Sequence, residues 1–319
     1  MSETLIEAVN LKKYFSTNAG VVHAVDDVSF KINAGETLGV VGESGCGKST
    51  LGRALIRLYD PTEGKILYRG EDIAAMGKEK FRKVQKQMQM IFQDPYSSIN
   101  PHFSVGETVL DPLRVSKTIT DKNKRMAKVT ETMELCGLPE RYFNTYPHEL
   151  DGGRRQRVGL ARALVLDPEF IVCDEPISAL DVSIQSQVVN MLEDMQEQMG
   201  LTYLFIAHDL SVVRHISNRI GVMYLGSLVE LGESYELNRH PIHPYTQTLL
   251  SAVPVPDPKL SRTRKRIILE GDVPSPMNPP SGCRFHTRCP YATEKCSQVT
   301  PVFREHEPGH WAACHLLDK

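Results

Sequence analysis

The 319-residue sequence lacks several features that would assign it to a class directly. It contains no run of about eighteen apolar residues, so we expect no segment that crosses a bilayer. Residues 1–7 lack the basic and apolar regions of a signal peptide, which favours a cytoplasmic protein. The 37 Lys and Arg residues are balanced by 39 Asp and Glu residues, so no basic excess favours nucleic-acid binding. A membrane role would therefore have to come through partners.

Cysteine is sparse until the end of the chain. Cys46, Cys136 and Cys173 are scattered, whereas the other four of the seven cysteines follow residue 280. A disulfide framework is not expected for so few cysteines in a chain of this length and setting. Proline is also concentrated late, with 12 of the 20 prolines between Pro241 and Pro308. We therefore expect no long regular helix there.

A phosphate-binding pattern, G-x-x-x-x-G-K-[ST], occupies residues 42–50. The apolar run Thr37–Val41 precedes it and the helical run Thr50–Leu58 follows it, which is the strand–loop–helix context that the motif requires. The glycines let backbone N–H groups face an anion, and the helix N-terminus adds a positive dipole. Lys48 is predicted to contact the β- and γ-phosphates and Ser49 to hold Mg²⁺. A plain glycine-rich turn is the alternative. The predicted nucleotide contacts in this loop are Gly42, Glu43, Ser44, Gly45, Cys46, Gly47, Lys48, Ser49 and Thr50.

The rest of the chain to about residue 240 alternates strand and helix patterns. Residues 6–32 alternate apolar and polar side chains, which predicts antiparallel strands. Tyr14 in this segment could lie against an adenine ring, or could be a half-buried strand aromatic. Later buried strands end at Gln93, at Asp174 and just before His208. This alternation predicts an α/β core with its ligand site at the C-terminal ends of the strands.

Changes in pattern along the chain suggest three parts. Residues 105–146 are helical and polar, which predicts a helical insert within the core. We expect a nucleotide-binding domain over residues 1–240, with a helical subdomain at about 94–165. The Pro- and Cys-rich remainder, residues 241–319, would form a small, irregular C-terminal module.

Several short motifs occur in the order that ABC transporters use, and residues 5–235 resemble their nucleotide-binding subunit. The motifs are the phosphate loop, Gln93, residues 150–154, Asp174 with Glu175, Asp181 and His208. The resemblance implies a P-loop ABC-type fold with a mixed sheet, an antiparallel subdomain and a helical insert. It also implies ATP hydrolysis with Mg²⁺, where Ser49, Gln93 and Asp174 form the metal environment. Glu175 would orient the attacking water and His208 would sense the γ-phosphate, with Gln93 and Asp181 completing the catalytic set.

One motif departs from the family pattern. Such subunits work as head-to-tail pairs in which a Leu-Ser-Gly-Gly-Gln signature covers the partner's ATP. The matching residues here are Leu150, Asp151, Gly152, Gly153 and Arg154. A hydroxyl would donate to the γ-phosphate, whereas the Asp151 carboxylate only accepts and has like charge. We therefore expect an asymmetric heterodimer whose more active site uses this chain's own phosphate loop. The alternative is that Asp151 points to solvent and is tolerated.

Finer resemblance comes from residues 93–101, 243–252 and 271–283, which look like the ATP-binding subunits of bacterial dipeptide/oligopeptide and nickel importers. This implies a second ATPase subunit, two transmembrane permease subunits and an extracytoplasmic binding protein. The chain would lie at the cytoplasmic face of the membrane, without nucleic acid. Import of nickel or another small solute, or an ATP-binding clamp with little turnover, are the alternatives. ABC ATPases of DNA repair or translation usually have two nucleotide domains or long coiled-coil insertions, and neither occurs here.

The last four cysteines need an explanation of their own. Cys283, Cys289, Cys296 and Cys314 lie in a segment with few apolar residues to offset its ordering entropy, which favours a metal staple. Thiolates suit zinc or an iron–sulfur cluster, and the spacing is typical of neither. Related peptide-importer subunits carry similar cysteines that hold a [4Fe–4S] cluster, so the resemblance implies one. Zinc and unligated thiols remain open.

Overall fold

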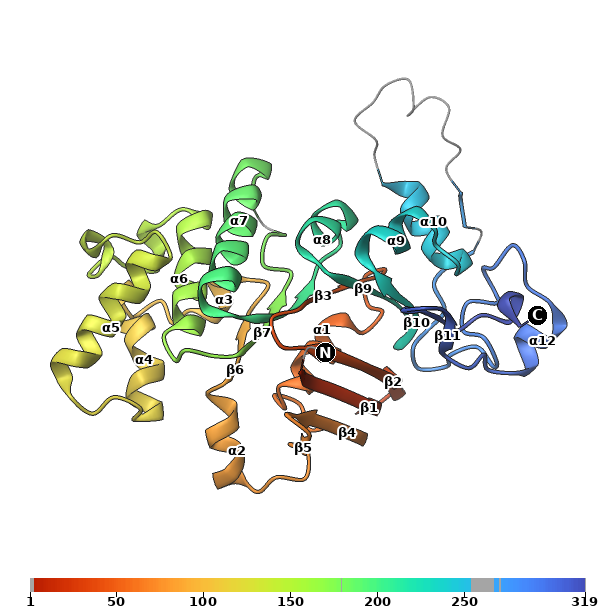
Figure 1. Ribbon diagram of the computed structural model, residues 1–319, viewed down its shortest axis with the longest axis horizontal. Helices are drawn as coiled ribbons and strands as arrows, with labels where there is room; N and C mark the ends of the chain where they lie inside the picture. The colour runs from red at the N-terminus through yellow and green to blue at the C-terminus, as the bar shows by residue number, and fades with distance from the viewer. Residues whose placement is uncertain (1–2, 179, 254–266, 270, 319) are drawn as a thin grey trace. The chain divides into compact units, whose positions relative to one another are not determined.

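The computed structural model describes residues 3–178, 180–253, 267–269 and 271–318, which fall into two compact units (Figure 1). The first unit consists mainly of residues 75–207, with short pieces at the N-terminus and at residues 33–36. The second unit consists of residues 4–32, 37–74 and the chain from residue 208 onward. No helix among the described residues is both long and apolar enough to cross a membrane.

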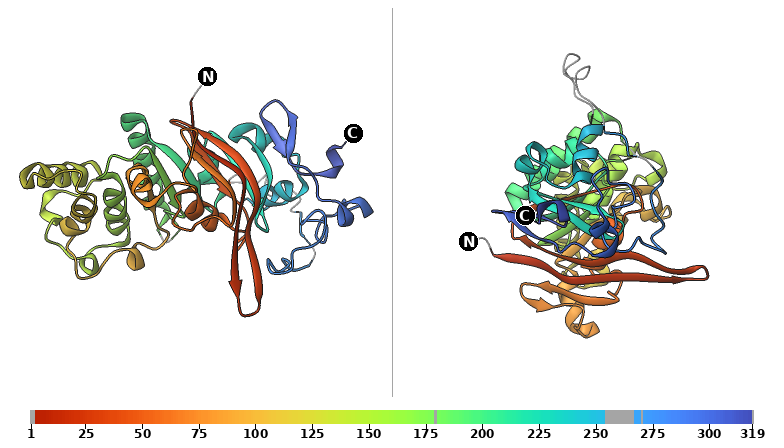
Figure 2. Two further views of the ribbon diagram at one scale, coloured as in Figure 1. Left: turned by 90° about the horizontal axis from the view of Figure 1, so that it is seen from below. Right: turned by 90° about the vertical axis from the view of Figure 1, so that its right-hand side faces the viewer.

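The second unit contains an antiparallel sheet that begins the chain. Its strands are β1 (Thr4–Thr17), β2 (Gly20–Asn33), β4 (Glu63–Tyr68) and β5 (Glu71–Asp72), in the order β2-β1-β4-β5. Strands β1 and β2 form a long hairpin, drawn in red in Figure 2. Ile6 lies opposite Tyr68 and Ala8 opposite Ile66, and the buried residues of β1 are Leu5, Ile6, Ala8 and Leu11. The antiparallel strands predicted from alternation are confirmed.

A second group of strands in this unit positions the phosphate loop. Strand β3 (Thr37–Val41) pairs in parallel with β9 (Arg219–Tyr224), and β10 (Ser227–Glu233) follows antiparallel. Every residue of β3 is buried, and the chain passes from β3 through the loop into α1 (Lys48–Leu55). The same unit contains helices α8 (Leu210–Ile216), α9 (Ser234–Arg239) and α10 (Pro244–Ala252).

The C-terminal part adds two strands that the sequence patterns did not predict. Strand β12 (His310–Ala312) pairs with β10, and β11 (Arg304–Glu307) pairs with β12. The other regular elements described after residue 240 are α10, which is given above, and the short helices α12 (Glu294–Gln298) and η3 (His315–Leu317). Strands of three or four residues are too short to show a periodic signal in the sequence. Their pairing with the sheet, rather than their own pattern, specifies them. The boundary near residue 240 stays a prediction, and residues 254–266, 270 and 319 of the predicted module lie outside the described residues.

The first unit contains parallel strands in the order β8-β7-β6. They are β6 (Met88–Ile91), β7 (Phe170–Asp174) and β8 (Thr202–Ile206). Every residue of β7 and β8 is buried, as expected for parallel strands that are covered on both faces. Helix α7 (Val182–Met199) joins β7 to β8. Because the strands are parallel, the residues that follow β6 and β7 emerge at the same edge.

The predicted helical insert is present in the same unit. Its elements are α3 (Pro95–Ser98), α4 (Val105–Ser116), α5 (Lys122–Leu135), η1 (Glu140–Tyr142), η2 (Pro147–Glu149) and α6 (Gly152–Leu164). Helix α2 (Lys78–Gln85) lies earlier in the chain, before β6. Helices α4, α5 and α6 lie together in Figure 1. Ser104 and Glu107 form a reciprocal capping box that fixes the start of α4. The subdomain bounds of 94–165 stay a prediction.

Candidate functional site

The phosphate loop is shaped by close backbone contacts that exclude side chains. A Cβ on Gly47, whose φ is 103°, would lie 2.0 Å from the carbonyl oxygen of Ala24. Lys48 is buried, and its Nζ donates to the backbone oxygens of Gly42 at 2.8 Å and Glu43 at 3.1 Å. The lysine Nζ therefore lies within its own loop and is hydrogen-bonded to two of its carbonyls.

Other loop residues predicted to bind nucleotide occupy the same turn. Ser44 and Gly45 are exposed, whereas Ser49 and Thr50 are half-buried in the first turn of α1. The Cys46 thiol is buried, and burial raises its pKa. It therefore stays a neutral packing group in this loop.

Tyr14 lies on β1 in the same unit and has a fixed hydroxyl. Its Oη donates to Asp26 Oδ1 at 2.5 Å, and its ring centroid is 4.3 Å from that of His23. Burial and the hydrogen bond to Asp26 raise the pKa of Tyr14, so the phenol stays protonated. Its proposed contact with adenine stays a prediction. His208, also in this unit, is exposed shortly before α8.

Gln93 and Glu175 meet at the edge where β6 and β7 end. Gln93 Nε2 donates to Glu175 Oε2 at 2.6 Å, and Glu175 is 5% exposed. Asp174, the last residue of β7, is fully buried, whereas Asp181 is exposed at the start of α7. The sequence placed Gln93 and Glu175 at strand ends, and the structure brings their side chains together.

The backbone of Glu175 is in an unusual conformation. Its φ is 48°, in the left-handed region, and its N–H donates to Ile206 O at 2.9 Å. A non-glycine residue in this region is held at a cost of order 1–3 kcal/mol, and such residues cluster at functional sites. In this conformation the Glu175 carboxylate accepts a hydrogen bond from Gln93 Nε2. Such a carboxylate is a group suited to orienting a water molecule.

The altered signature residues contact each other at the start of α6. Asp151 Oδ1 accepts from the Arg154 backbone N at 2.7 Å, and Oδ2 accepts from Arg154 Nη1 at 2.5 Å. Both side chains are about half exposed. Asp151 thus caps the helix, and Arg154 offsets its charge. Leu150 and Gly153 are buried, and Gly152 is exposed.

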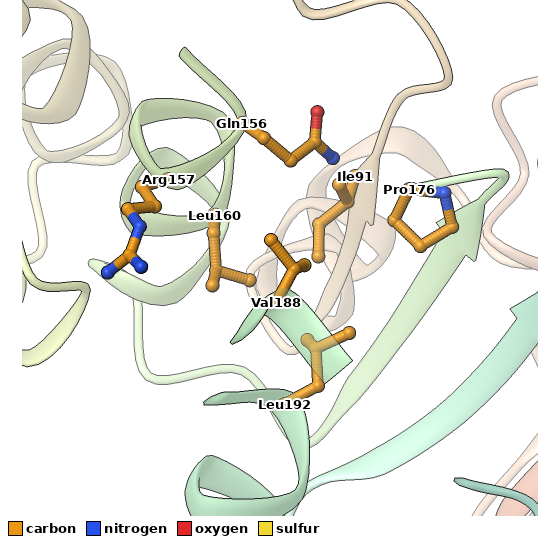
Figure 3. A pocket seen from close by; sticks show the side chains of 7 residues that line it. All are labelled: Ile91, Gln156, Arg157, Leu160, Pro176, Val188 and Leu192. Atoms are coloured by element: carbon orange, nitrogen blue, oxygen red, sulfur yellow. The ribbon is translucent and has the colours of Figure 1, made fainter. Parts of the chain in front are cut away.

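Helix α6 is tightly packed against the strand that leads to Gln93. Figure 3 shows the side chains that meet there, from α6, α7, β6 and the residue after Glu175, and the gap between them leaves no room for a water molecule. They are Ile91, Gln156, Arg157, Leu160, Pro176, Val188 and Leu192. This gap is too small for a ligand. The side chains around it pack the signature helix against the Gln93–Glu175 edge.

Two arginines of α6 also bind the segment after Gln93, which the sequence analysis missed. The Arg155 guanidinium lies 3.7 Å from the Tyr96 ring centroid and donates to Pro147 O at 2.6 Å. Arg162 donates to Ser98 O. In sequence these arginines are ordinary basic residues of a helix, so nothing marked them.

Side chains from the C-terminal part reach the predicted nucleotide elements of the second unit, and these were missed too. Tyr245 Oη accepts from the backbone N of Glu43 at 2.9 Å. Arg288 donates to both carboxylate oxygens of Glu43, at 2.8 Å and 3.2 Å. Arg284 donates to Asp26, the partner of Tyr14. No spacing rule links residue 43 to residue 288, so only the structure could show the contact.

The four late cysteines do not form the expected cluster site. All four thiols are free, and burial, together with the other three cysteines, raises the pKa of Cys314 to about 11. Within the described ranges, no group of three or more His, Cys, Asp or Glu side chains is arranged to hold a metal ion. The Cys296 thiol lies 3.4 Å from the Thr293 hydroxyl. The structure therefore gives no support to a [4Fe–4S] cluster at Cys283, Cys289, Cys296 and Cys314, although the donor type is suitable.

Comparison with family profiles covers much of the chain. The family described as "ABC transporter" matches residues 25–178. The family described as "Oligopeptide/dipeptide transporter, C-terminal region" matches residues 229–296. The first range contains the phosphate loop, Gln93, residues 150–154 and Glu175, whereas Asp181 and His208 lie between the two ranges.

Named relatives match nearly end to end. The oligopeptide transport ATP-binding protein AppF of Bacillus subtilis is 54% identical, over 98% of this chain and 98% of the relative. The oligopeptide transport ATP-binding protein OppF of Haemophilus influenzae is 51% identical, over 96% of this chain and 92% of the relative. Among solved structures, the dimeric ATP-binding cassette MJ0796 bound to ADP and phosphate is 27% identical. It aligns with a TM-score of 0.66 over 72% of this chain and 98% of the cassette.

Proposed function

This chain belongs to the ABC transporter family, together with the oligopeptide transport ATP-binding proteins, and we propose on that premise that it hydrolyses ATP to drive import of dipeptides and oligopeptides. The observation that carries the proposal is the Gln93–Glu175 hydrogen bond, 2.6 Å long, at the edge where two parallel strands end. An amide and a nearly buried carboxylate in contact there are suited to a hydrolytic site, because one side chain can orient water and the other can respond to bound nucleotide. Peptides are the cargo favoured by the names of the relatives.

The chain's own residues divide the work of hydrolysis. Lys48, which now donates to loop carbonyls, would turn to phosphate oxygens, and the backbone N–H groups of the loop would surround them. Glu175 would accept a hydrogen bond from the attacking water, and His208 would contact the γ-phosphate. Asp181 would support the turn that connects Glu175 to α7.

Magnesium fits the oxygen donors available. A hydroxyl from Ser49, an amide oxygen from Gln93 and a carboxylate from Asp174 are the hard ligands that Mg²⁺ prefers. When bound, the ion would neutralise charge on the phosphates. Gln93 would contribute its amide oxygen, while its Nε2 is the atom that donates to Glu175, so the two roles are compatible.

The signature supports a proposal of asymmetry. Asp151 presents a carboxylate where a hydroxyl donor is usual. Its pairing with Arg154 reduces the negative charge but does not replace the lost donor. In a head-to-tail heterodimer this signature would cover the partner's ATP at the weaker site. The chain's own phosphate loop and Glu175 would then belong to the more active site.

The proposed assembly follows from the same family. A second ATPase subunit, two transmembrane permease subunits and an extracytoplasmic substrate-binding protein would complete the importer. The chain would lie at the cytoplasmic face of the membrane, held there by the permeases. Nickel or another small solute is the alternative cargo, and an ATP-binding clamp with little turnover is the alternative role.

A metal at the late cysteines is a narrower proposal. The proposal of a [4Fe–4S] cluster rests on the resemblance and on the donor type, since all four thiols are free, and the present arrangement would have to adjust to hold one. A brown anaerobic preparation that absorbs near about 400 nm would favour the cluster. A colourless, iron-free preparation would eliminate it, and zinc content would decide the remaining alternative.

The decisive experiment is ATPase activity of the reconstituted importer with Glu175→Gln. Loss of most activity is expected, because the amide is a poorer acceptor for the attacking water. Glu131→Gln, an exposed change on α5, is the matched control. Full activity in Glu175→Gln would place hydrolysis on the partner and leave this chain as a clamp. Comparing the uptake of labelled peptide with the uptake of labelled nickel by the reconstituted importer identifies the cargo.

A further inference from the structure

The C-terminal part carries two arginines, Arg284 and Arg288, that each bind a carboxylate next to the predicted ATP contacts. We propose that residues 284–288 are a positioning element that holds the phosphate loop and Tyr14 in the geometry needed for ATP. The proposal rests on the ATP binding proposed above and assigns the C-terminal part a share in it. The arginines act through Glu43 and Asp26, so they are positioning residues rather than catalytic ones.

Arg288 controls the charge of the phosphate loop. Glu43 is the second residue of the loop, and Arg288 holds its carboxylate by two hydrogen bonds, of 2.8 Å and 3.2 Å. The Arg288 side chain is only 8% exposed. Burial alone lowers the pKa of Arg288, but the hydrogen bonds with Glu43 and Tyr224 outweigh it and raise the pKa, so the guanidinium stays charged. A carboxylate beside a polyphosphate repels it, and a bidentate guanidinium cancels most of that repulsion.

Tyr245 fixes the backbone of the same loop residue. Its hydroxyl accepts from the Glu43 N–H at 2.9 Å, while Lys48 donates to the Glu43 carbonyl at 3.1 Å. Tyr245 is fully buried on α10. The main chain and side chain of Glu43 are thus held by residues that lie 202 and 245 positions later in the sequence.

Arg284 acts on the adenine side. It donates to Asp26 Oδ2, while the other oxygen of Asp26 accepts from Tyr14 Oη at 2.5 Å. Its second nitrogen donates to the carbonyl of Leu225. Burial would raise the pKa of Asp26, but Tyr14 and Arg284 together lower it, so the carboxylate remains charged and bridges the two. Removing Arg284 would take the guanidinium away from this part-buried carboxylate and leave Tyr14 and, at 3.7 Å, His23 as its partners.

Phe285 anchors the two arginines to the core. It is 1% exposed, and its ring centroid lies 5.2 Å from that of Tyr224 and 5.3 Å from that of Tyr245. Tyr224 ends β9, the strand paired with β3, and β3 leads directly into the phosphate loop. A buried aromatic between two ion pairs makes a rigid support, because such side chains have few alternative rotamers. Residues 284–288 therefore support groups at both the phosphate end and the adenine end of the proposed nucleotide site.

The test uses the full chain and measures binding of Mg-ATP and of inorganic tripolyphosphate by calorimetry. Arg288→Gln should weaken both ligands by roughly three- to thirtyfold, because it exposes the Glu43 charge to phosphates. Arg284→Gln should weaken ATP by a similar factor and leave tripolyphosphate unchanged, because it disturbs Tyr14 alone. Arg304→Gln, which breaks a partly exposed pair with Asp318 in the same part of the chain, is the control and should change neither.

Each outcome has one meaning. Addition of Glu43→Gln to Arg288→Gln should restore most tripolyphosphate binding, since the unpaired charge is then gone. If wild type binds no ATP, the proposed function fails. If wild type binds ATP and both arginine variants bind it equally well, the positioning role is overturned. Equal loss of both ligands in Arg284→Gln overturns its assignment to the adenine side. Arg288→Lys, which retains the charge, replaces Arg288→Gln if thermal unfolding shows that the latter is not folded, and an intermediate loss is expected.

Discussion

Asp151 Oδ2 lies 2.5 Å from Arg154 Nη1 across the first turn of α6, so the two departures from the usual signature form one ion pair. The pair also caps the helix through the Arg154 N–H. Because both side chains are about half exposed, its contribution to stability is small. Its importance lies in the charge that the signature would present to a bound phosphate.

Asp151→Ser should raise the ATPase activity of the reconstituted complex. A serine caps a helix about as well as an aspartate, so the free energy of unfolding should change by less than about 1 kcal/mol. The hydroxyl would donate a hydrogen bond to the phosphate, which the carboxylate repels. Activity at the weaker site should therefore rise several-fold, the rate factor that corresponds to the free energy of about one hydrogen bond. Unchanged activity would eliminate asymmetry caused by this residue. Arg154→Gln alone should lower activity, because it leaves the Asp151 charge uncompensated.

Glu175→Gly should remove activity without lowering stability. The backbone at position 175 has a φ of 48°, which glycine adopts without strain. The free energy of unfolding is therefore expected to stay level or to rise by about 1 kcal/mol. Glu197→Gly on α7 is the matched control, and should cost about 1 kcal/mol because it places glycine inside a helix. Urea unfolding of both variants checks the comparison, and a destabilised Glu175→Gly would show that the position is not strained.

His243 should make the fold lose stability in mildly acidic solution. It is buried, and burial lowers its pKa from 6.5 to about 4 against the opposing charge of Glu230. The unfolded chain therefore takes up a proton near pH 6.5 while the folded chain does not until about pH 4. Stability is retained above the unfolded pKa and falls as the pH drops through this window, by up to about 3 kcal/mol at about 1.4 kcal/mol per unit.

The His243 assignment can be checked by removing the titration and keeping the cap. His243 Nδ1 accepts from the Tyr245 N–H at 3.1 Å at the start of α10. His243→Asn keeps an acceptor at this N-cap, so its unfolding free energy should vary less between pH 7 and pH 5 than that of wild type. His102→Asn, on an exposed residue, should leave the wild-type slope unchanged. Equal slopes in all three proteins would assign the pH dependence elsewhere.

The sequence predicted the parts of the site that depend on local pattern. The phosphate loop, the strand ends at Gln93 and Glu175 and the helical insert all have short-range signals of spacing and periodicity. The contacts of Arg288 with Glu43 and of Arg162 with Ser98 have none, because tertiary packing creates them. The pairing of Asp151 with Arg154 could be predicted from the sequence, since residues three apart at a helix are neighbours on one face. The strands β11 and β12 were missed because pairing with β10, rather than their own composition, specifies them.

Arg162→Lys should separate ATP hydrolysis from transport. Arg162 on α6 donates to Ser98 O, and its guanidinium lies 5.7 Å from the Phe92 ring centroid, so it holds both sides of the Gln93 loop. In the proposed importer this loop transmits the nucleotide state to the permeases. Lysine keeps the charge but lacks the planar group that reaches both partners. Uptake of labelled peptide into proteoliposomes should fall about tenfold while ATPase activity changes by less than about twofold.

The control for this uncoupling is a change of the same kind at a site that does not touch the loop. Arg141 stacks on Tyr142 in η1, with its guanidinium 5.2 Å from the ring centroid. Arg141→Lys should therefore leave uptake and ATPase activity at wild-type levels. If Arg162→Lys lowered the two activities by the same factor, the arginine would be supporting the catalytic edge itself, through Gln93, rather than the link from that edge to the membrane subunits.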